Sequence, residues 1–134
     1  MLMYIEGSTE VVSWGGSTEE RRKGRTPVAE SKVTIVVPDA ATMEKCLTAL
    51  EESDRRLATM GPGTGGYDWQ IVFREDMADG SGKVHFGVVW YDTDFYRAKR
   101  EIFSASDHTS MFGRLGFTAD DVSVEHWVKD AAAA

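Results

Sequence analysis

Two side chains that could act as an acid and a base, His85 and Glu125, fall on strand-like segments of this 134-residue chain. In both segments apolar and polar residues alternate, which places the two side chains on the same outer face of a sheet. An imidazole and a carboxyl group together can carry out general acid–base catalysis, and a water or ligand could bridge them. The same face is expected to carry Gln70, Arg74, Tyr91 and Trp127. A polar patch at an interface explains residues of such common types better than catalysis does, so the site is predicted as a binding surface without catalytic residues.

The three histidines, His85, His108 and His126, do not have the spacing of metal ligands. No H-E-x-x-H or C-x-x-C pattern occurs, and His85 and His126 fall on opposite faces of their strands. We therefore predict no metal and no cofactor. His126 is expected in the core with a hydrogen bond. The single cysteine, Cys46, lies among the apolar positions of a predicted helix and is expected to be a buried thiol.

A second candidate site lies in a polar loop between residues 15 and 27. It holds four basic residues within five positions, Arg21, Arg22, Lys23 and Arg25. Such a group could bind an anion, and a solvated loop is the simpler interpretation.

The elements that must position these residues follow from hydrophobic periodicity. Strands are predicted at 31–37, 67–74, 83–91 and 122–129. The second and third of them flank a polar turn that contains glycine, which predicts a hairpin. One helix of about 20 residues is expected to begin after Asp39, and another after Asp92. The order is β-α-β-β-α-β, which predicts an α+β domain.

Over residues 31–129 this order resembles the ferredoxin-like fold. The resemblance implies an antiparallel four-stranded sheet with two helices on one face. Two short apolar segments, 1–5 and 10–14, predict an additional N-terminal β-hairpin. The chain is then divided into residues 1–30 (hairpin and basic loop), residues 31–130 (sandwich domain) and residues 131–134 (a frayed tail).

The two faces of this sheet are predicted from residue parity. Trp69, Ile71 and Phe73 should face the helices, while Val72 and Arg74 should lie on the outer face. The outer face also receives Val36, Val89 and Trp127, which makes it too apolar for a fully solvated surface. The N-terminal hairpin, a second copy of the chain or a ligand could cover it.

RNA-recognition modules share this element order, and the segment GKVHFGVVWY partly resembles their third-strand motif. Gly87 stands where a stacking aromatic residue is expected, and only His85 and Tyr91 could stack on bases. The net charge is −7, from 22 acidic and 15 basic residues, and this argues against nucleic-acid binding.

The leading hypothesis is therefore a small acidic protein-interaction module, such as an inhibitor, an antidote protein or an assembly component. Its partner would be a protein, one with a basic surface being an option, and a homodimer is a further option. The alternative is a small-molecule-binding or catalytic domain that uses the outer face around His85 and Glu125. No apolar run approaches the ~20 residues that span a bilayer, so we expect no membrane association and a cytoplasmic location.

Overall fold

The computed structural model describes residues 7–11, 24–60, 66–105 and 110–134, and of residues 7–11, 57–60 and 70–71 it describes the backbone alone. It has both helices and strands, as predicted. The strands are β1 (Gly7–Val11), β2 (Ala29–Val37), β3 (Tyr67–Met77), β4 (Gly82–Trp90) and β5 (Val122–Val128). The helices are α2 (Ala40–Met60) and α3 (Thr93–Lys99), with short 3-10 turns η1 (Gly113–Leu115) and η2 (Ala131–Ala133).

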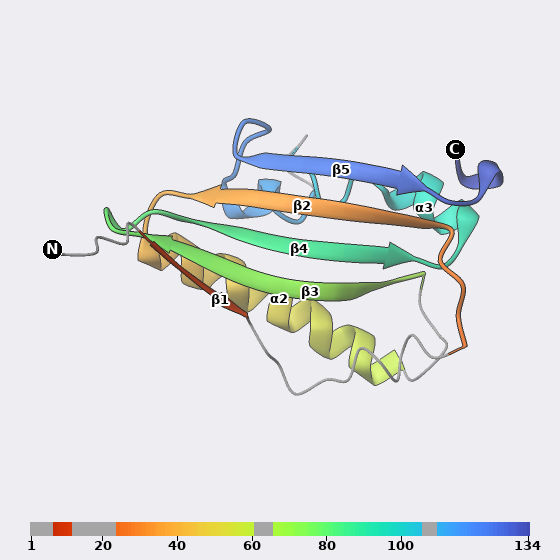
Figure 1. Ribbon diagram of the computed structural model, residues 1–134, viewed down its shortest axis with the longest axis horizontal. Helices are drawn as coiled ribbons and strands as arrows, with labels where there is room; N and C mark the ends of the chain where they lie inside the picture. The colour runs from red at the N-terminus through yellow and green to blue at the C-terminus, as the bar shows by residue number, and fades with distance from the viewer. Residues whose placement is uncertain (1–6, 12–23, 61–65, 106–109) are drawn as a thin grey trace, which may run out of the picture.

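The strands form one antiparallel sheet in the order β1-β3-β4-β2-β5. Figure 1 shows α2 lying along one side of this sheet, with α3 near the end where β4 and β5 finish. We call the side that packs against α2 the inner face and the opposite side the outer face. The core of the molecule lies between the inner face and the helices.

Helix α2 begins and packs as its sequence predicts. The carboxylate of Asp39 accepts a hydrogen bond from the backbone N–H of Thr42 at 2.7 Å, which caps the first turn. Met43, Cys46 and Leu50 recur at helical spacing and are fully buried. Burial raises the pKa of the Cys46 thiol to about 12, so the thiol stays protonated and unreactive.

Helix α3 is shorter than its apolar pattern suggests. It begins at the N-cap Asp92, as expected, but it ends at Lys99. Within it Tyr96 is buried and Ala98 is exposed, and residues 100–105 are not helical. Phe112 and Phe117, from the chain on either side of η1, complete the cover of the inner face.

Aromatic side chains fill the centre of the core. Trp69, Phe86, Trp90 and Phe103 lie with ring centroids 5.3–5.8 Å apart, in edge-on or tilted contacts. Such contacts add to the stabilisation that burial of the rings provides. This cluster joins β3 and β4 to the segment that follows α3.

A β-bulge in β3 overturns part of the predicted face assignment. Trp69 pairs with Val88 and Val72 pairs with Phe86, so β3 has one extra residue between these two pairs. Every residue after the bulge therefore changes face. Val72 is buried on the inner face, and Phe73 lies on the outer face. The parity prediction had placed each of them on the opposite face.

The N-terminal segment also differs from its prediction. The expected turn at Gly7 and the expected strand from Glu10 instead form a single strand, β1, which pairs with β3. The open edge of β3 offers a long row of backbone partners, whereas a two-stranded hairpin alone is marginally stable. The rest of the predicted hairpin lies outside the described residues. At the other end, where fraying was expected, Asp130 caps the turn η2 and Ala133 is buried.

The start of β4 provides a test of this packing. A Cβ atom on Gly82 would overlap the backbone oxygen of Glu75 and come within 2.8 Å of the Met43 side chain. We expect Gly82→Ala to lower the free energy of unfolding by about 1–3 kcal/mol, because the hairpin must shift against α2. Urea denaturation followed by circular dichroism measures it. The control is Lys83→Ala, at the neighbouring exposed position. An equal decrease of the free energy of unfolding in this variant would contradict the explanation.

Candidate functional site

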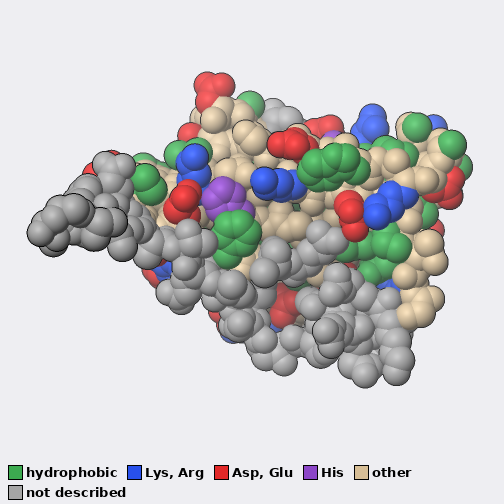
Figure 2. Space-filling view, viewed as in Figure 1, with side chains coloured by type: hydrophobic (Ala, Val, Ile, Leu, Met, Phe, Trp, Pro, Cys, Tyr) green, Lys and Arg blue, Asp and Glu red, His purple; other side chains and the backbone are tan. Residues whose placement is uncertain are grey.

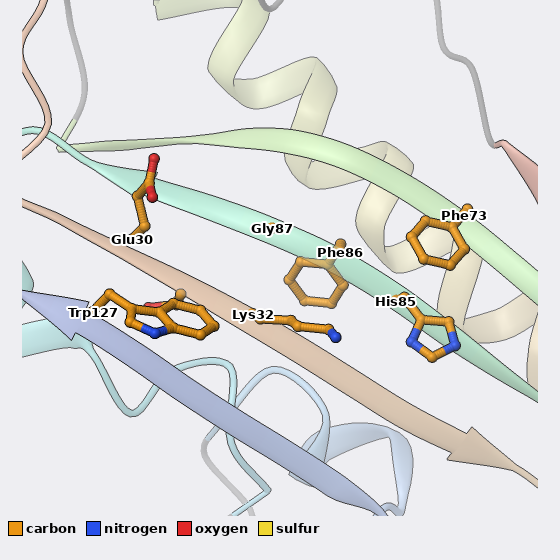
Figure 3. Close-up of a pocket in the computed structure, with 8 residues that line it drawn as sticks. Glu30, Lys32, Phe73, His85, Phe86, Gly87 and Trp127 are labelled. Atoms are coloured by element: carbon orange, nitrogen blue, oxygen red, sulfur yellow. The ribbon is translucent and has the colours of Figure 1, made fainter.

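The outer face carries a shallow depression of about 250 Å³. Its floor is Gly87, which has no side chain to fill the space between its neighbours on the sheet. Figure 3 shows Phe73 and His85 on one side of this floor and Trp127 on the other, with Lys32 between them. The outward-facing residues that line the depression are Glu30, Lys32, Phe73, His85, Gly87 and Trp127.

His85 is held by three neighbours. Its ring stacks on Phe73 with centroids 4.7 Å apart and planes inclined by 18°. Its Nδ1 atom lies 3.4 Å from Thr34 Oγ1, and its Nε2 atom lies 3.6 Å from a carboxylate oxygen of Glu75. Both ring nitrogens therefore face groups of the sheet itself, and the ring contributes a flat, half-buried wall to the depression.

The predicted acid–base partners His85 and Glu125 lie on the same face but not beside each other. Strand β2 lies between them: His85 on β4 pairs with Thr34 of β2, whereas Glu125 on β5 pairs with Lys32 of β2. The two residues are separated by two strand spacings and by one step along the strands, about 12 Å in all. Glu75 is the carboxylate that approaches His85, and Lys32 is the group that faces Glu125.

Arg74 is not part of this surface. The bulge turns it to the inner face, where its guanidinium donates two hydrogen bonds to Asp76, at 2.8 and 3.0 Å. A third bond, of 3.2 Å, goes to Glu44 on α2. The hydrogen bonds to Asp76 raise the pKa of Arg74 further above its usual value. The side chain thus ties the β3–β4 hairpin to α2.

The remaining predicted site residues divide between two regions. Trp127 lies on the outer face at the rim of the depression and is 49% exposed. Tyr91 follows the end of β4, and the guanidinium of Arg25 stacks over its ring at 4.0 Å. One member of the predicted basic cluster therefore meets one member of the predicted binding face. The side chain of Gln70 and all of Arg21, Arg22 and Lys23 lie outside the described part of the chain.

Charges on the outer face are balanced although the chain is acidic. The solvent-accessible ionic side chains described on it are three glutamates and three lysines, Glu30, Glu75, Glu125, Lys32, Lys83 and Lys129. They pair with each other: Lys32 is opposite Glu125, Lys83 is opposite Glu75, and the ammonium group of Lys129 lies 3.4 Å from Glu30. Figure 2 shows acidic and basic side chains interspersed with hydrophobic ones on this side.

Sequence reasoning missed Phe73, Gly87 and Glu75 as site residues. Phe73 and Glu75 were hidden by the bulge, and no glycine or proline marks the bulge in the sequence. In the sequence, Gly87 was noted only because it stands where RNA-recognition modules have a stacking aromatic residue. A small residue in the middle of an otherwise apolar strand was the available signal for a depression.

His126 lies on the inner face, as predicted, in a chain of hydrogen bonds. The indole N–H of Trp90 donates to Ser31 Oγ at 2.8 Å, and Ser31 Oγ lies 2.6 Å from His126 Nδ1. The hydroxyl of Ser31 accepts from the indole, and it can either donate to an unprotonated Nδ1 or accept from a protonated one, depending on the tautomer of the ring. Burial lowers the pKa of His126, Glu101 opposes this shift and Arg100 supports it.

Within the described ranges, no group of three or more histidine, cysteine, aspartate or glutamate side chains is close enough to hold a metal ion. None of the described helices has the length and apolar character needed to cross a bilayer.

Comparisons with protein-family models, with curated proteins and with solved structures give no match for this chain. The geometry of the outer face is therefore the basis for any proposal about function.

The lowered pKa of His126, which burial causes, predicts a dependence of stability on pH. The folded protein favours the neutral ring, and the unfolded chain binds a proton near pH 6.5. The stabilisation is therefore complete above about pH 6.5 and is lost as the pH falls through the lowered pKa of the folded state. We expect the urea midpoint to fall as the pH is lowered from about 7 to 5.

The control for this prediction is His126→Asn, because its side-chain amide can accept a hydrogen bond from Ser31 or donate one to it but cannot be protonated in this range. The midpoint of the variant should change less than that of the wild type. Equal pH slopes in the two proteins would show that the buried imidazole does not cause the effect.

Proposed function

We propose that this protein is a non-catalytic binding module that engages another polypeptide through the outer face of its sheet. The observation that carries the proposal is the position of the exposed apolar side chains. Among the described residues four large hydrophobic side chains are exposed, and Val36, Met77 and Trp127 of these lie on the outer face. Their exposed fractions are 44%, 37% and 49%. Apolar groups gathered on one face are typical of interaction sites.

The shape of the surface supports a polypeptide partner. The depression beside Trp127 has room for a bulky side chain, and its aromatic walls favour an apolar one. Trp127 can itself act as an anchor, since tryptophan is among the residues whose loss costs most at protein interfaces. The paired charges around this centre resemble the polar rim of an interface.

Acid–base chemistry on this face has less support. His85 and Glu125 are separated by about 12 Å, and each faces a different neighbour on the sheet. The alternative hypothesis of a catalytic or small-molecule site would need a substrate that reaches both groups. The depression lies beside only one of them.

The finer description of the fold belongs with this proposal. The strand order β3-β4-β2-β5, with β1 as an added edge strand, supports a ferredoxin-like arrangement with its helical cover on one face. Many unrelated functions use that arrangement, so it adds no weight to a particular activity. Roles as an inhibitor, an antidote or an assembly component stay predictions, as do the basic partner surface and the cytoplasmic location.

Adjacent residues on β5 provide a matched test. Trp127 and Val128 are 49% and 42% exposed, but they lie on opposite faces of the sheet. We expect Trp127→Ser to weaken binding of a partner polypeptide at least tenfold, because an interface anchor is worth about 2 kcal/mol or more. Native mass spectrometry of complexes isolated from the cells that make the protein measures the bound fraction.

The control is Val128→Ser, which removes a similarly exposed apolar side chain from the other face. It should leave the bound fraction unchanged, and circular dichroism should show both variants folded. Two results would rule out the outer face as a binding surface. One is an equal decrease of the bound fraction in the two variants, and the other is a wild-type chain that binds neither another protein nor a second copy of itself.

A further inference from the structure

We infer that the polypeptide bound at the outer face is a second copy of this chain, packed face to face about a two-fold axis. The inference rests on the proposed function and adds the identity of the partner. It follows from the charge pattern of the outer face, from its area, and from the relative positions of Trp127, Gly87, Lys32 and Glu125.

The charge pattern is compatible with self-association at this face in particular. Two chains of net charge −7 repel each other overall. The outer face contributes little to that repulsion, because the three solvent-accessible glutamates described on it are matched by three lysines. Asp68, a further acid on this face, is 2% exposed. Such a face has no net attraction for a strongly basic partner, and it can be complementary to itself.

The area of the surface is sufficient for a modest dimer. Strands β3, β4, β2 and β5 have 7–11 residues each and lie side by side. At about 4.8 Å between strands and about 3.4 Å per residue, the face covers roughly 600 Å² in projection. Side-chain relief increases the accessible area toward the ~800 Å² per partner of a standard interface.

The strand register allows one symmetric arrangement that satisfies the anchor and the charges together. Trp127 pairs with Glu30, and Gly87 pairs with Lys32, so Trp127 and Gly87 are two strands and one side-chain step apart. Consider a two-fold axis that lies in the plane between the two sheets and crosses the line from Trp127 to Gly87 at its midpoint, at a right angle. This axis places each Trp127 over the depression at Gly87 of the other copy. On the same grid of strand spacings, this axis brings Lys32 of each copy close to Glu125 of the other.

That arrangement predicts a charge-exchange experiment with the full-length chain. Lys32→Glu alone places two carboxylates against each other at both symmetric contacts, and Glu125→Lys alone places two ammonium groups against each other. We expect each variant alone to have a dimer dissociation constant at least about tenfold higher than the wild type, because like charges at an interface repel. Sedimentation equilibrium over a range of concentrations measures these constants.

Mixing the two variants is the decisive step. At each of the two contacts one variant then supplies a glutamate and the other a lysine, so both contacts are again between opposite charges. We expect the mixture to form a heterodimer about as tight as the wild-type dimer. Damage to the fold of a single variant could not produce this recovery. As a further variant, Trp127→Ser should weaken the dimer, while Val128→Ser should not.

The outcomes separate this inference from the proposed function. A wild-type chain that stays monomeric at millimolar concentration, or a mixture that dimerises no better than its components, would overturn the second copy as the partner. If such a monomer still bound another protein in a Trp127-dependent way, the proposed function would stand. If it bound none, both would be wrong.

Discussion

A single extra residue in β3 determines which side chains meet on either side of the sheet. The bulge between Trp69 and Val72 lets β3 keep Trp69 in the core and then reverses the parity of the rest of the strand. Phe73 can stack on His85 only because of this reversal, and Arg74 can reach Glu44 on α2 for the same reason. The bulge thus supplies one wall of the outer depression and one tie between the hairpin and the helix.

We propose the outer face as the binding surface because the core already fills the space on the inner side. Tryptophan and phenylalanine rings fill the space between the sheet and the helical side, and the buried hydroxyl of Ser31 forms a hydrogen bond with the partly buried ring of His126. Among the described large apolar side chains, Val128 is exposed on the inner side, whereas Val36, Met77 and Trp127 are exposed on the outer side. A partner that buries apolar area gains most by covering the outer face.

The charges of the protein and the charges of this face lead to different expectations about partners. If the acidic residues were evenly spread over the surface, a net charge of −7 would favour basic partners. The paired glutamates and lysines of the outer face remove that bias where contact would occur. In the proposed complex, apolar area and the fit of Trp127 to a depression would determine the partner, and the net charge would affect mainly the rate of encounter.

The sequence by itself determined the features that depend on neighbouring residues. Asp39 and Asp92 cap helices because a cap is a local hydrogen bond, and Val33 and Ile35 face the core because strand parity is local. It also placed His126 on the inner face with a hydrogen bond, and Trp127 on the outer face. Only the tertiary structure decided the position of the bulge, the pairing of β1 with β3 and the neighbours of His85. These depend on how one strand registers against another, and register is set by packing between segments far apart in the chain.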